Sequence, residues 1–177
     1  MHQNRQYLGH LLMDTLTQDR LHQVLSYDPV TGAFVWLQST SNRAPAGAIA
    51  GTMQPNGYLR ITIDGVRMYA HRLAWLYVYG EWPSGDIDHI DGVRTNNAVN
   101  NLRDVPRGVN MQNQRRARSN NRTSGLLGVT WHARRHRWCA QIQVDGKRKG
   151  IGYFDDAETA HQAYLDAKRK LHAGCSI

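Results

Sequence analysis

The sequence predicts an α+β protein in which two small domains follow one another along the chain. Alternating apolar and polar runs flank the Asp-Gly pairs at 64–65 and 145–146, and Asp-Gly between such runs is a strong hairpin signal. A stretch with apolar residues at helical spacing follows each hairpin. The polar, basic segment 118–124 between the two halves is typical of a linker. We therefore expect a tail at 1–13, a first domain at 14–117 and a second domain at 125–177.

The first domain is expected to combine short helices and short strands. Thr17 is a suitable N-cap for a helix whose apolar face carries Leu21, Val24 and Leu25. The elements expected after it are a strand within 33–37, the hairpin around 64–65, a helix at 71–79 ended by Gly80, a strand at 86–90, a polar loop at 91–100, a strand at 102–105 and a helix opened by Pro106. Because 41% of all residues are apolar, we expect a packed core.

The second domain is expected to be a three-stranded antiparallel sheet packed on one helix. The strands are predicted at 128–133, 137–144 and 147–154, and the helix begins near Ala157 and is ended by Gly174. In the middle strand, alternation puts Trp138 on one face with Ala140 and Ile142, and Gln141 and Gln143 on the other. Trp138 is therefore either a core residue or part of an exposed face.

The net charge of +8 is concentrated in one segment. Residues 115–149 contain ten Lys or Arg and only Asp145 against them, a charge of +9, whereas the rest of the chain holds 12 basic and 13 acidic residues, a charge of −1. A localised basic block indicates a polyanionic partner. The block is predicted to be strands and loop, not the amphipathic helix of a membrane binder, so we expect nucleic acid and no membrane.

Cysteine use and the N-terminus exclude several other classes. Cys139 and Cys175 are far apart and neither is part of a C-x-x-C pair, so we expect two reduced thiols and no cysteine-based zinc site. No stretch reaches the roughly 18 apolar residues that a membrane span needs. The first residues lack the apolar core and cleavage site of a signal peptide, so the protein is expected in the cytoplasm, where it is made.

Groups suited to hydrolytic chemistry concentrate in the segment DIDHIDG. It holds Asp86, Asp88, His89 and Asp91 at the end of a predicted strand. Carboxylates are ligands for Mg²⁺ or Mn²⁺, and a neutral imidazole can accept a proton near neutral pH. Phosphodiester hydrolysis uses both functions. Taken alone, the pattern fits a solvated surface loop equally well.

The residues around this segment resemble the HNH endonucleases. The spacing D-H-I-D-G-x-x-x-N-N-x-x-x-N-L-R-x-V-x-x-x-x-N, with the lead-in AHRLAWLYVYGEWP, is similar to the phage and intron-homing branch of that family over about residues 27–116. The resemblance implies a ββα-metal fold and a homing-type or phage-encoded endonuclease that uses Mg²⁺ or Mn²⁺ to hydrolyse double-stranded DNA. It further implies action in a bacterial host cell if the chain is phage-encoded.

The resemblance also implies a role for individual residues. His89 would be the general base, Asp88 a metal ligand, and Asn101 a structural residue that ties down the loop and helps to hold His89. Asn110 would be the second metal ligand, with Asn113 as the alternative. Asp91 would stabilise its turn or assist the metal, and His71 matches a family histidine whose role stays open between packing, phosphate contact and catalysis.

The segment 123–174 resembles the Apetala-type (ethylene-response-factor) DNA-binding domain. The similar pieces are G-V-T-W, R-W-x-A-x-I, G-Y-F and the helix A-E-x-A-x-x-A-Y-x-x-A. The resemblance implies that the sheet contacts DNA through Trp131, Arg134, Arg135, Arg137, Trp138, Gln141, Gln143, Lys147 and Lys149. Trp131 has a core role as its alternative. The helix that carries Asn110 continues into Arg115 and Arg116, which suit phosphate contact. His132 and His136 lack further ligands nearby, which disfavours a metal site there.

We therefore expect a DNA endonuclease that acts as a monomer, which would nick one strand, or as a homodimer. The alternative from another class is a sequence-specific DNA-binding regulator with an inactive nuclease domain. A third hypothesis is an enzyme directed at RNA.

Overall fold

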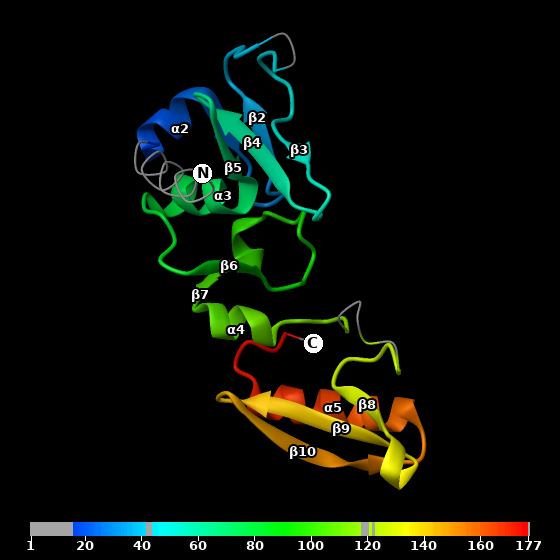
Figure 1. Cartoon of the computed structure of the whole chain (residues 1–177). Helices are drawn as coiled ribbons and strands as arrows, with labels where there is room; N and C mark the ends of the chain where they lie inside the picture. The colour runs from blue at the N-terminus through cyan, green and yellow to red at the C-terminus, as the bar shows by residue number, and fades with distance from the viewer. Residues whose placement is uncertain (1–15, 42–43, 118–120, 122, 177) are drawn as a thin grey trace, which may run out of the picture. The chain divides into compact units, whose positions relative to one another are not determined.

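The computed structural model of the chain describes residues 16–41, 44–117, 121 and 123–176 (Figure 1). The chain divides into two compact units, Met1–Val105 and Pro106–Ile177. Each combines helices with small antiparallel sheets, which confirms the α+β class. In the part of the chain described, no helix has the length and apolar character needed to cross a membrane.

Within its described residues, 16–41 and 44–105, the first unit contains two helices and three small sheets. Its elements are α2 (Gln18–Val24), β1 (Leu25–Tyr27), β2 (Phe34–Trp36), β3 (Thr52–Met53), β4 (Leu59–Ile63), β5 (Val66–Tyr69), α3 (Ala70–Tyr79), β6 (Asp86–His89), the 3₁₀ turn η1 (Val99–Asn101) and β7 (Leu102–Val105). Strands β1 and β2 pair with each other, β3, β4 and β5 form one sheet in that order, and β6 pairs with β7.

The N-terminal helix begins as its cap predicts but ends earlier than expected. The Thr17 hydroxyl accepts a hydrogen bond from the backbone N–H of Arg20 at 3.2 Å, as an N-cap does. Leu25, expected on the helix, instead opens β1 opposite Trp36 of β2. Leu25 is fully buried in the strand, and the apolar face of a helix would also have buried it. Hydrophobic spacing alone therefore did not distinguish a helix position from a strand position.

The hairpin around Asp64 and Gly65 has the predicted geometry. Both residues have positive φ, 50° and 82°, as a type I′ turn requires, and Ile63 pairs with Val66. Strand β3 adds to the outer side of β4 and was not predicted, because two exposed residues carry no periodicity. Helix α3 ends at Gly80, whose φ of 78° suits the left-handed helix terminus expected from its sequence.

Among the described residues, one core joins both helices and every strand of the first unit except β3. Buried side chains from both helices and from β1, β2, β4 and β5 form it together with Ile87 of β6 and Leu102 of β7. Apolar residues on one face of the β6–β7 ribbon thus attach that ribbon to the rest of the unit. The polar neighbours of Ile87 are thereby held at the edge of the core.

The β1–β2 turn supports the loop between β6 and β7. The Tyr27 hydroxyl donates to the carbonyl of Asn97 at 2.7 Å, and the N–H of Val99 donates to the carbonyl of Pro29 at 3.2 Å. Gly32 has a φ of 72°, and a Cβ at this position would lie 2.3 Å from the backbone of Asn97. Only glycine allows this close approach of two backbones.

The second unit is a three-stranded sheet with one long helix on it. Its elements are α4 (Arg107–Gln112), β8 (Val129–His132), the 3₁₀ turn η2 (Ala133–Arg135), β9 (Arg137–Val144), β10 (Lys147–Phe154) and α5 (Ala157–Leu171). The strand order is β10–β9–β8, and α5 runs along the sheet (Figure 1). Val129, Ala140 and Ile142 pack against Ala160 and Tyr164 of α5. The helix ends at Leu171 with His172 as its C-cap, before the expected Gly174.

The second unit begins at Pro106, earlier than the domain boundary expected after residue 117. The end of α4 and the residues after it contact the C-terminal segment: Gly174 N–H donates to Gln112 Oε1 at 3.0 Å, and Arg115 donates to the carbonyl of Ser176 at 3.1 Å. Buried Lys168 of α5 donates to the carbonyl of Gln114. Such contacts between distant residues leave no trace in local composition. The expected tail at 1–13 and several residues of the expected linker lie outside the described residues.

The close approach at Gly32 gives a stability prediction. Gly32→Ala is expected to lower the free energy of unfolding by about 3 kcal/mol or more, because a left-handed backbone and a steric clash add. Gly65→Ala is the matched control, since Gly65 has a similar φ of 82° but nothing within 4 Å of its Cβ position. It should lose only about 1 kcal/mol. Equal losses in thermal or urea unfolding would contradict the role assigned to the Gly32 contact.

Candidate active site

The β6–β7 ribbon places the predicted metal ligand Asp88 and the predicted general base His89 at the edge of the core. Asp88 and His89 lie opposite Arg103 and Leu102 in the antiparallel register. Their exposed fractions are only 6% and 4%, far below what polar side chains on a solvated loop would show. The solvated-loop alternative for this segment is therefore excluded for these two residues. His89 is also the last residue of β6, so the loop of residues 90–98 starts beside it.

Asn101 holds this loop through hydrogen bonds to Asp91. Its Nδ2 donates to Asp91 Oδ1 at 3.0 Å and to the carbonyl of Asn96 at 2.8 Å, while its Oδ1 accepts from the Asp91 N–H at 3.0 Å. Asn96 Nδ2 and Val93 N–H also donate to the Asp91 carboxylate, both at 2.7 Å. Burial would raise the pKa of Asp91, but these hydrogen bonds outweigh it and lower the pKa. The contacts favour the turn-stabilising interpretation of Asp91.

A further asparagine, Asn97, contacts the His89 ring. Its Oδ1 lies 3.2 Å from His89 Nε2, and the side chain is almost fully buried. The sequence pointed to Asn101 as the residue that helps to hold His89 and did not single out Asn97. The pair Asn96-Asn97 in a loop directly after the D-H pair was the available signal, but no spacing rule says which of the loop's asparagines turns inward.

The contacts of Asn97 determine which nitrogen of His89 carries the hydrogen. Asn97 Nδ2 donates to the carbonyl of Thr95 at 3.3 Å, which orients Oδ1 toward the ring. Because Oδ1 only accepts, Nε2 of His89 has to donate. In a neutral imidazole the lone pair then belongs to Nδ1. The His89 ring is thus held in the tautomer with a basic Nδ1.

Two aromatic rings lie close to the His89 ring. The His71 ring meets it edge to face, with centroids 5.2 Å apart at 84°, and the Tyr58 ring lies 5.9 Å away. His71 also stacks on Tyr69 at 5.4 Å. Among the described residues its buried Nδ1 has no hydrogen-bond partner. His71 therefore packs against the site, and of the three open roles the contacts favour packing.

Burial keeps both histidine rings neutral. It is the largest cause that lowers the pKa of His89, whereas the hydrogen bond to Asn97 and the carboxylates of Asp91 and Asp88 act in the opposite direction. His71 lacks such support, and burial next to His89 lowers its pKa to about 3. A neutral ring at His89 is the form that can accept a proton.

Asp88 forms an ion pair with the arginine opposite it. Arg103 Nε and Nη2 donate to Asp88 Oδ2 at 2.9 and 2.7 Å, and the carboxylate is nearly buried while Arg103 is partly exposed. Both of these hydrogen bonds are made to the same carboxylate oxygen. Among the described residues, no group of three or more His, Cys, Asp or Glu could hold a metal ion. The metal ligands expected from the sequence are one carboxylate and one asparagine amide. Such a pair does not count as a group of this kind, because asparagine is not one of these four residue types.

The predicted second ligand and its alternative both lie at α4 in the second unit. Asn110 is half-buried within the helix, and Asn113 is its C-cap residue. The Asn113 side chain is buried, and its Oδ1 accepts a hydrogen bond from the Ser176 hydroxyl. Asn113 thus contributes to the packing of the C-terminal segment.

The strand register divides the predicted DNA-contact residues between two faces of the second unit's sheet. Directly opposed residues share a face. Trp131 lies opposite Trp138, Lys147 opposite Val144 and Lys149 opposite Ile142, so all of these share the face that α5 covers. Trp138 packs against the core, so its contacts favour the core role over the exposed one. Trp131, which lies opposite it on the same face, is 42% exposed.

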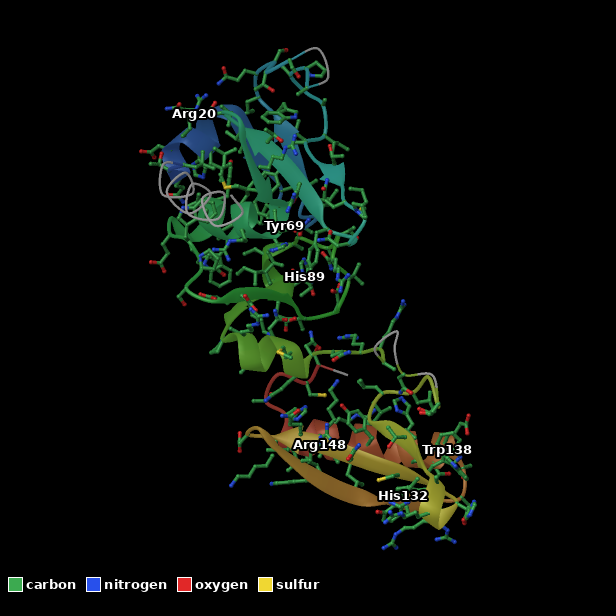
Figure 2. All side chains as sticks on the ribbon, viewed as in Figure 1. Arg20, Tyr69, His89, His132, Trp138 and Arg148 are labelled. Atoms are coloured by element: carbon green, nitrogen blue, oxygen red, sulfur yellow. The ribbon has the colours of Figure 1, made fainter. Side chains whose placement is uncertain are left out.

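The open face carries another set of polar side chains. Gln143 lies opposite Arg148 and Arg137 opposite His132, and Gln141 shares their face. Arg148 was not among the predicted contact residues, although its place in the strand alternation would have indicated this face. Trp138 and Arg148 lie at opposite ends of the sheet (Figure 2). Of the predicted strand residues, the open face brings together Arg137, Gln141 and Gln143.

The remaining predicted contact residues are exposed and lie outside the strands. Arg134 and Arg135 belong to η2, and the Arg135 guanidinium lies 4.5 Å from the centre of the Tyr153 ring. Arg115 and Arg116 follow α4. Arg137 itself forms an ion pair with Asp155 at 3.0 Å, with both partners largely exposed.

Comparison with known proteins assigns a family to the part of the chain that carries these residues. Residues 68–112 match the HNH endonuclease family. This range contains Asp88, His89, Asn101 and Asn110, so this part of the chain is an HNH endonuclease domain.

A phage protein is similar over a longer stretch. The chain is 35% identical over 103 residues to Protein 3.8 of Escherichia phage T7, which covers 58% of this chain and 83% of the phage protein. The chain belongs to the same family as this phage protein. A solved structure of the HNH homing endonuclease I-HmuI, which concerns DNA binding and cleavage, has a TM-score of 0.41 and 20% identity, covering 85% of this chain and 88% of that one.

The buried neutral His71 predicts a loss of stability in acid. Its pKa is about 3 in the folded chain and near 6.5 in the unfolded chain, so the unfolded state binds more protons between these values. Stability therefore falls as the pH decreases below about 6.5. His71→Phe should reduce the difference in unfolding free energy between about pH 7.5 and about pH 5 by about 2 kcal/mol. An unchanged difference in urea titrations at the two pH values would show that His71 does not titrate in this way.

Proposed function

We propose that the chain is a DNA endonuclease that hydrolyses phosphodiester bonds with the help of a divalent cation, Mg²⁺ or Mn²⁺. The observation that carries the proposal is the buried Asp88–His89 pair, in which Asn97 holds the imidazole as a neutral ring with a basic Nδ1. A carboxylate next to an oriented base is the arrangement that water activation at a phosphate requires. The HNH match over residues 68–112 supports the same reaction.

His89 is the general base in the proposed mechanism. Its Nδ1 takes a proton from a water molecule, whose oxygen attacks phosphorus while the bond from phosphorus to one sugar oxygen breaks. The imidazolium that forms keeps its Nε2–H donated to Asn97, and the neighbouring Asp88 and Asp91 carboxylates stabilise its positive charge. The Asp91–Asn101 hydrogen bonds keep the loop, and therefore Asn97, in place.

Asp88 and Asn110 are the proposed metal ligands. Both offer the hard oxygen atoms that Mg²⁺ and Mn²⁺ prefer, and such ions commonly take only one or two protein ligands beside water and phosphate. When bound, the ion would offset negative charge on the phosphate and on the leaving oxygen. Arg103 orients the Asp88 carboxylate through two hydrogen bonds to Oδ2. Asn110 occupies the third signature position of the family pattern, and Asn113 is its alternative.

The second unit is proposed to bind double-stranded DNA as an Apetala-type domain. Its exposed arginines and lysines supply affinity through phosphates, and the open face with Gln141 and Gln143 offers hydrogen-bonding groups for base edges. One HNH site per chain can cut one strand at a time. A monomer therefore nicks, and a double-strand break requires a homodimer or two successive events. The similarity to Protein 3.8 of Escherichia phage T7 supports a phage-related role, and the resemblance to the homing branch of the HNH family makes a homing-type role the other candidate.

The direct test is nicking of supercoiled plasmid. Wild-type protein is expected to convert it to open circles with Mg²⁺ or Mn²⁺ and to lose this activity with EDTA. His89→Ala should lower the rate by about 10²- to 10⁴-fold, because the general base is lost. Binding of duplex DNA without cutting under any divalent ion would instead support a regulator with an inactive nuclease. Preferential cutting of RNA of matched length would contradict the DNA assignment.

The contact between Asn97 and His89 gives a second activity prediction. Asn97→Ala removes the acceptor for Nε2–H, so it should lower kcat by roughly 100-fold with little change in DNA binding. Asn96→Ala is the matched control, because the Asn96 side chain bonds to Asp91 in the same loop, whereas that of Asn97 bonds to the ring itself. The control should retain most of the activity. If both variants lost activity equally, the loop's rigidity, and not the tautomer of His89, would explain the loss.

A further inference from the structure

Beside His89, two tyrosines and two arginines form a cluster that the proposed mechanism does not use. We call Tyr58, Arg60, Tyr69 and Arg94 the tyrosine–arginine surface. The Tyr58 ring lies 5.4 Å from the Tyr69 ring and 5.9 Å from the His89 ring. Tyr69 and His89 both lie against the His71 ring, with centroid distances of 5.4 and 5.2 Å. The surface therefore adjoins the site where the proposed reaction takes place.

Arg94 is held at the tip of the loop that begins at His89. Its Nη1 donates to the carbonyl of Asn56 at 2.7 Å, and its guanidinium carbon lies 5.0 Å from the centre of the Tyr58 ring. The residue is exposed. One hydrogen bond and one cation–π contact position the guanidinium while its other N–H groups face the surroundings.

Arg60 is held in the same way on β4. Its guanidinium carbon lies 4.5 Å from the centre of the Tyr69 ring, and its Nη2 donates to the Tyr69 hydroxyl at 3.0 Å. Asn56 Nδ2 donates to the same hydroxyl at 3.2 Å. A hydroxyl oxygen accepts two hydrogen bonds and donates one. Both acceptor positions of Tyr69 are therefore in use, which leaves its proton to donate to an acceptor from outside.

The positive charge of the surface is not balanced. Among the described residues, neither Arg60 nor Arg94 forms an ion pair, whereas Arg20 is paired with Asp64 and Arg103 with Asp88. Two fixed cations and a hydroxyl donor match the oxygens of a phosphate group. These side chains are already held in place in the free protein. Binding an anion therefore costs little further side-chain conformational entropy.

We propose that Arg60, Arg94 and the Tyr69 hydroxyl bind a backbone phosphate of duplex DNA next to the phosphate that is cut. This inference rests on the proposed function, since it places DNA at His89. Contacts to phosphates set the position of a protein on the duplex and carry no sequence information. The tyrosine–arginine surface thus positions the cut strand relative to His89 independently of the second unit.

The test is the salt dependence of DNA binding by the full chain. The dissociation constant for a labelled duplex of about 30 base pairs is measured by fluorescence anisotropy in EDTA between about 50 and 200 mM KCl. Arg60→Gln and Arg94→Gln should each weaken binding about 5- to 20-fold at low salt and reduce the slope of log K against log[salt] by about 1. Tyr69→Phe should weaken binding several-fold with an unchanged slope, because it removes a donor and no charge.

Arg20→Gln is the matched control. Arg20 is exposed, its charge is offset by Asp64, and it lies well away from Tyr69 and His89 (Figure 2). Its slope should equal that of the wild type. Arg94→Lys, which keeps the charge, should keep the slope, and this exposed position provides a readout even if Arg60→Gln fails to fold.

The outcomes separate this inference from the proposed function. If the wild type nicks plasmid but Arg60→Gln and Arg94→Gln keep the wild-type slope, the inference is overturned and the nuclease assignment stands. If the slopes fall as expected and the wild type never cuts, the phosphate contact is supported and the nuclease assignment is wrong. Slopes that fall only with an RNA duplex would overturn the DNA partner.

Discussion

The hydrogen bonding of one loop is the constraint on which the candidate active site depends. Residues 90–98 leave β6 beside His89 and bring Asp91 and the buried Asn97 against the core. Buried polar groups that lack partners cost free energy, so the loop is stable only in a conformation that pairs them. Asn101 pairs with Asp91, and Asn97 pairs with His89. The same bonds that satisfy the loop therefore also orient the proposed base.

The rest of the first unit supplies the packing around this loop. The β1–β2 turn contacts it from one side through Tyr27 and Gly32, and the rings of Tyr58 and His71 contact His89 from another. Burial by these groups lowers the pKa of His89, and Asn97 and the nearby carboxylates oppose that effect. Burial is the larger effect, so the pKa of His89 is lowered and the proposed base is neutral. A proton acceptor that had been protonated in advance could not activate water.

The two units divide the proposed tasks by charge. The excess positive charge lies almost entirely in residues 115–149, which suits binding to a polyanion over a wide area. The first unit is nearly neutral overall but places unbalanced arginines beside its active site. A broad basic surface provides affinity and does not require a fixed geometry. A few fixed side chains beside the site provide local positioning, which does require one.

Periodicity and local motifs by themselves determined much of this protein. The Asp-Gly hairpins, the Thr17 cap, the Gly80 helix end, the sheet with α5 and the place of Asp88 and His89 in a short strand all follow from patterns among residues near in sequence. Only the tertiary structure decided that Asn97 holds His89, that Arg103 pairs with Asp88, that Leu25 starts a strand and that Lys147 and Lys149 share the helix-covered face. These outcomes depend on which distant segments meet and on strand register, and neither quantity is encoded in local spacing.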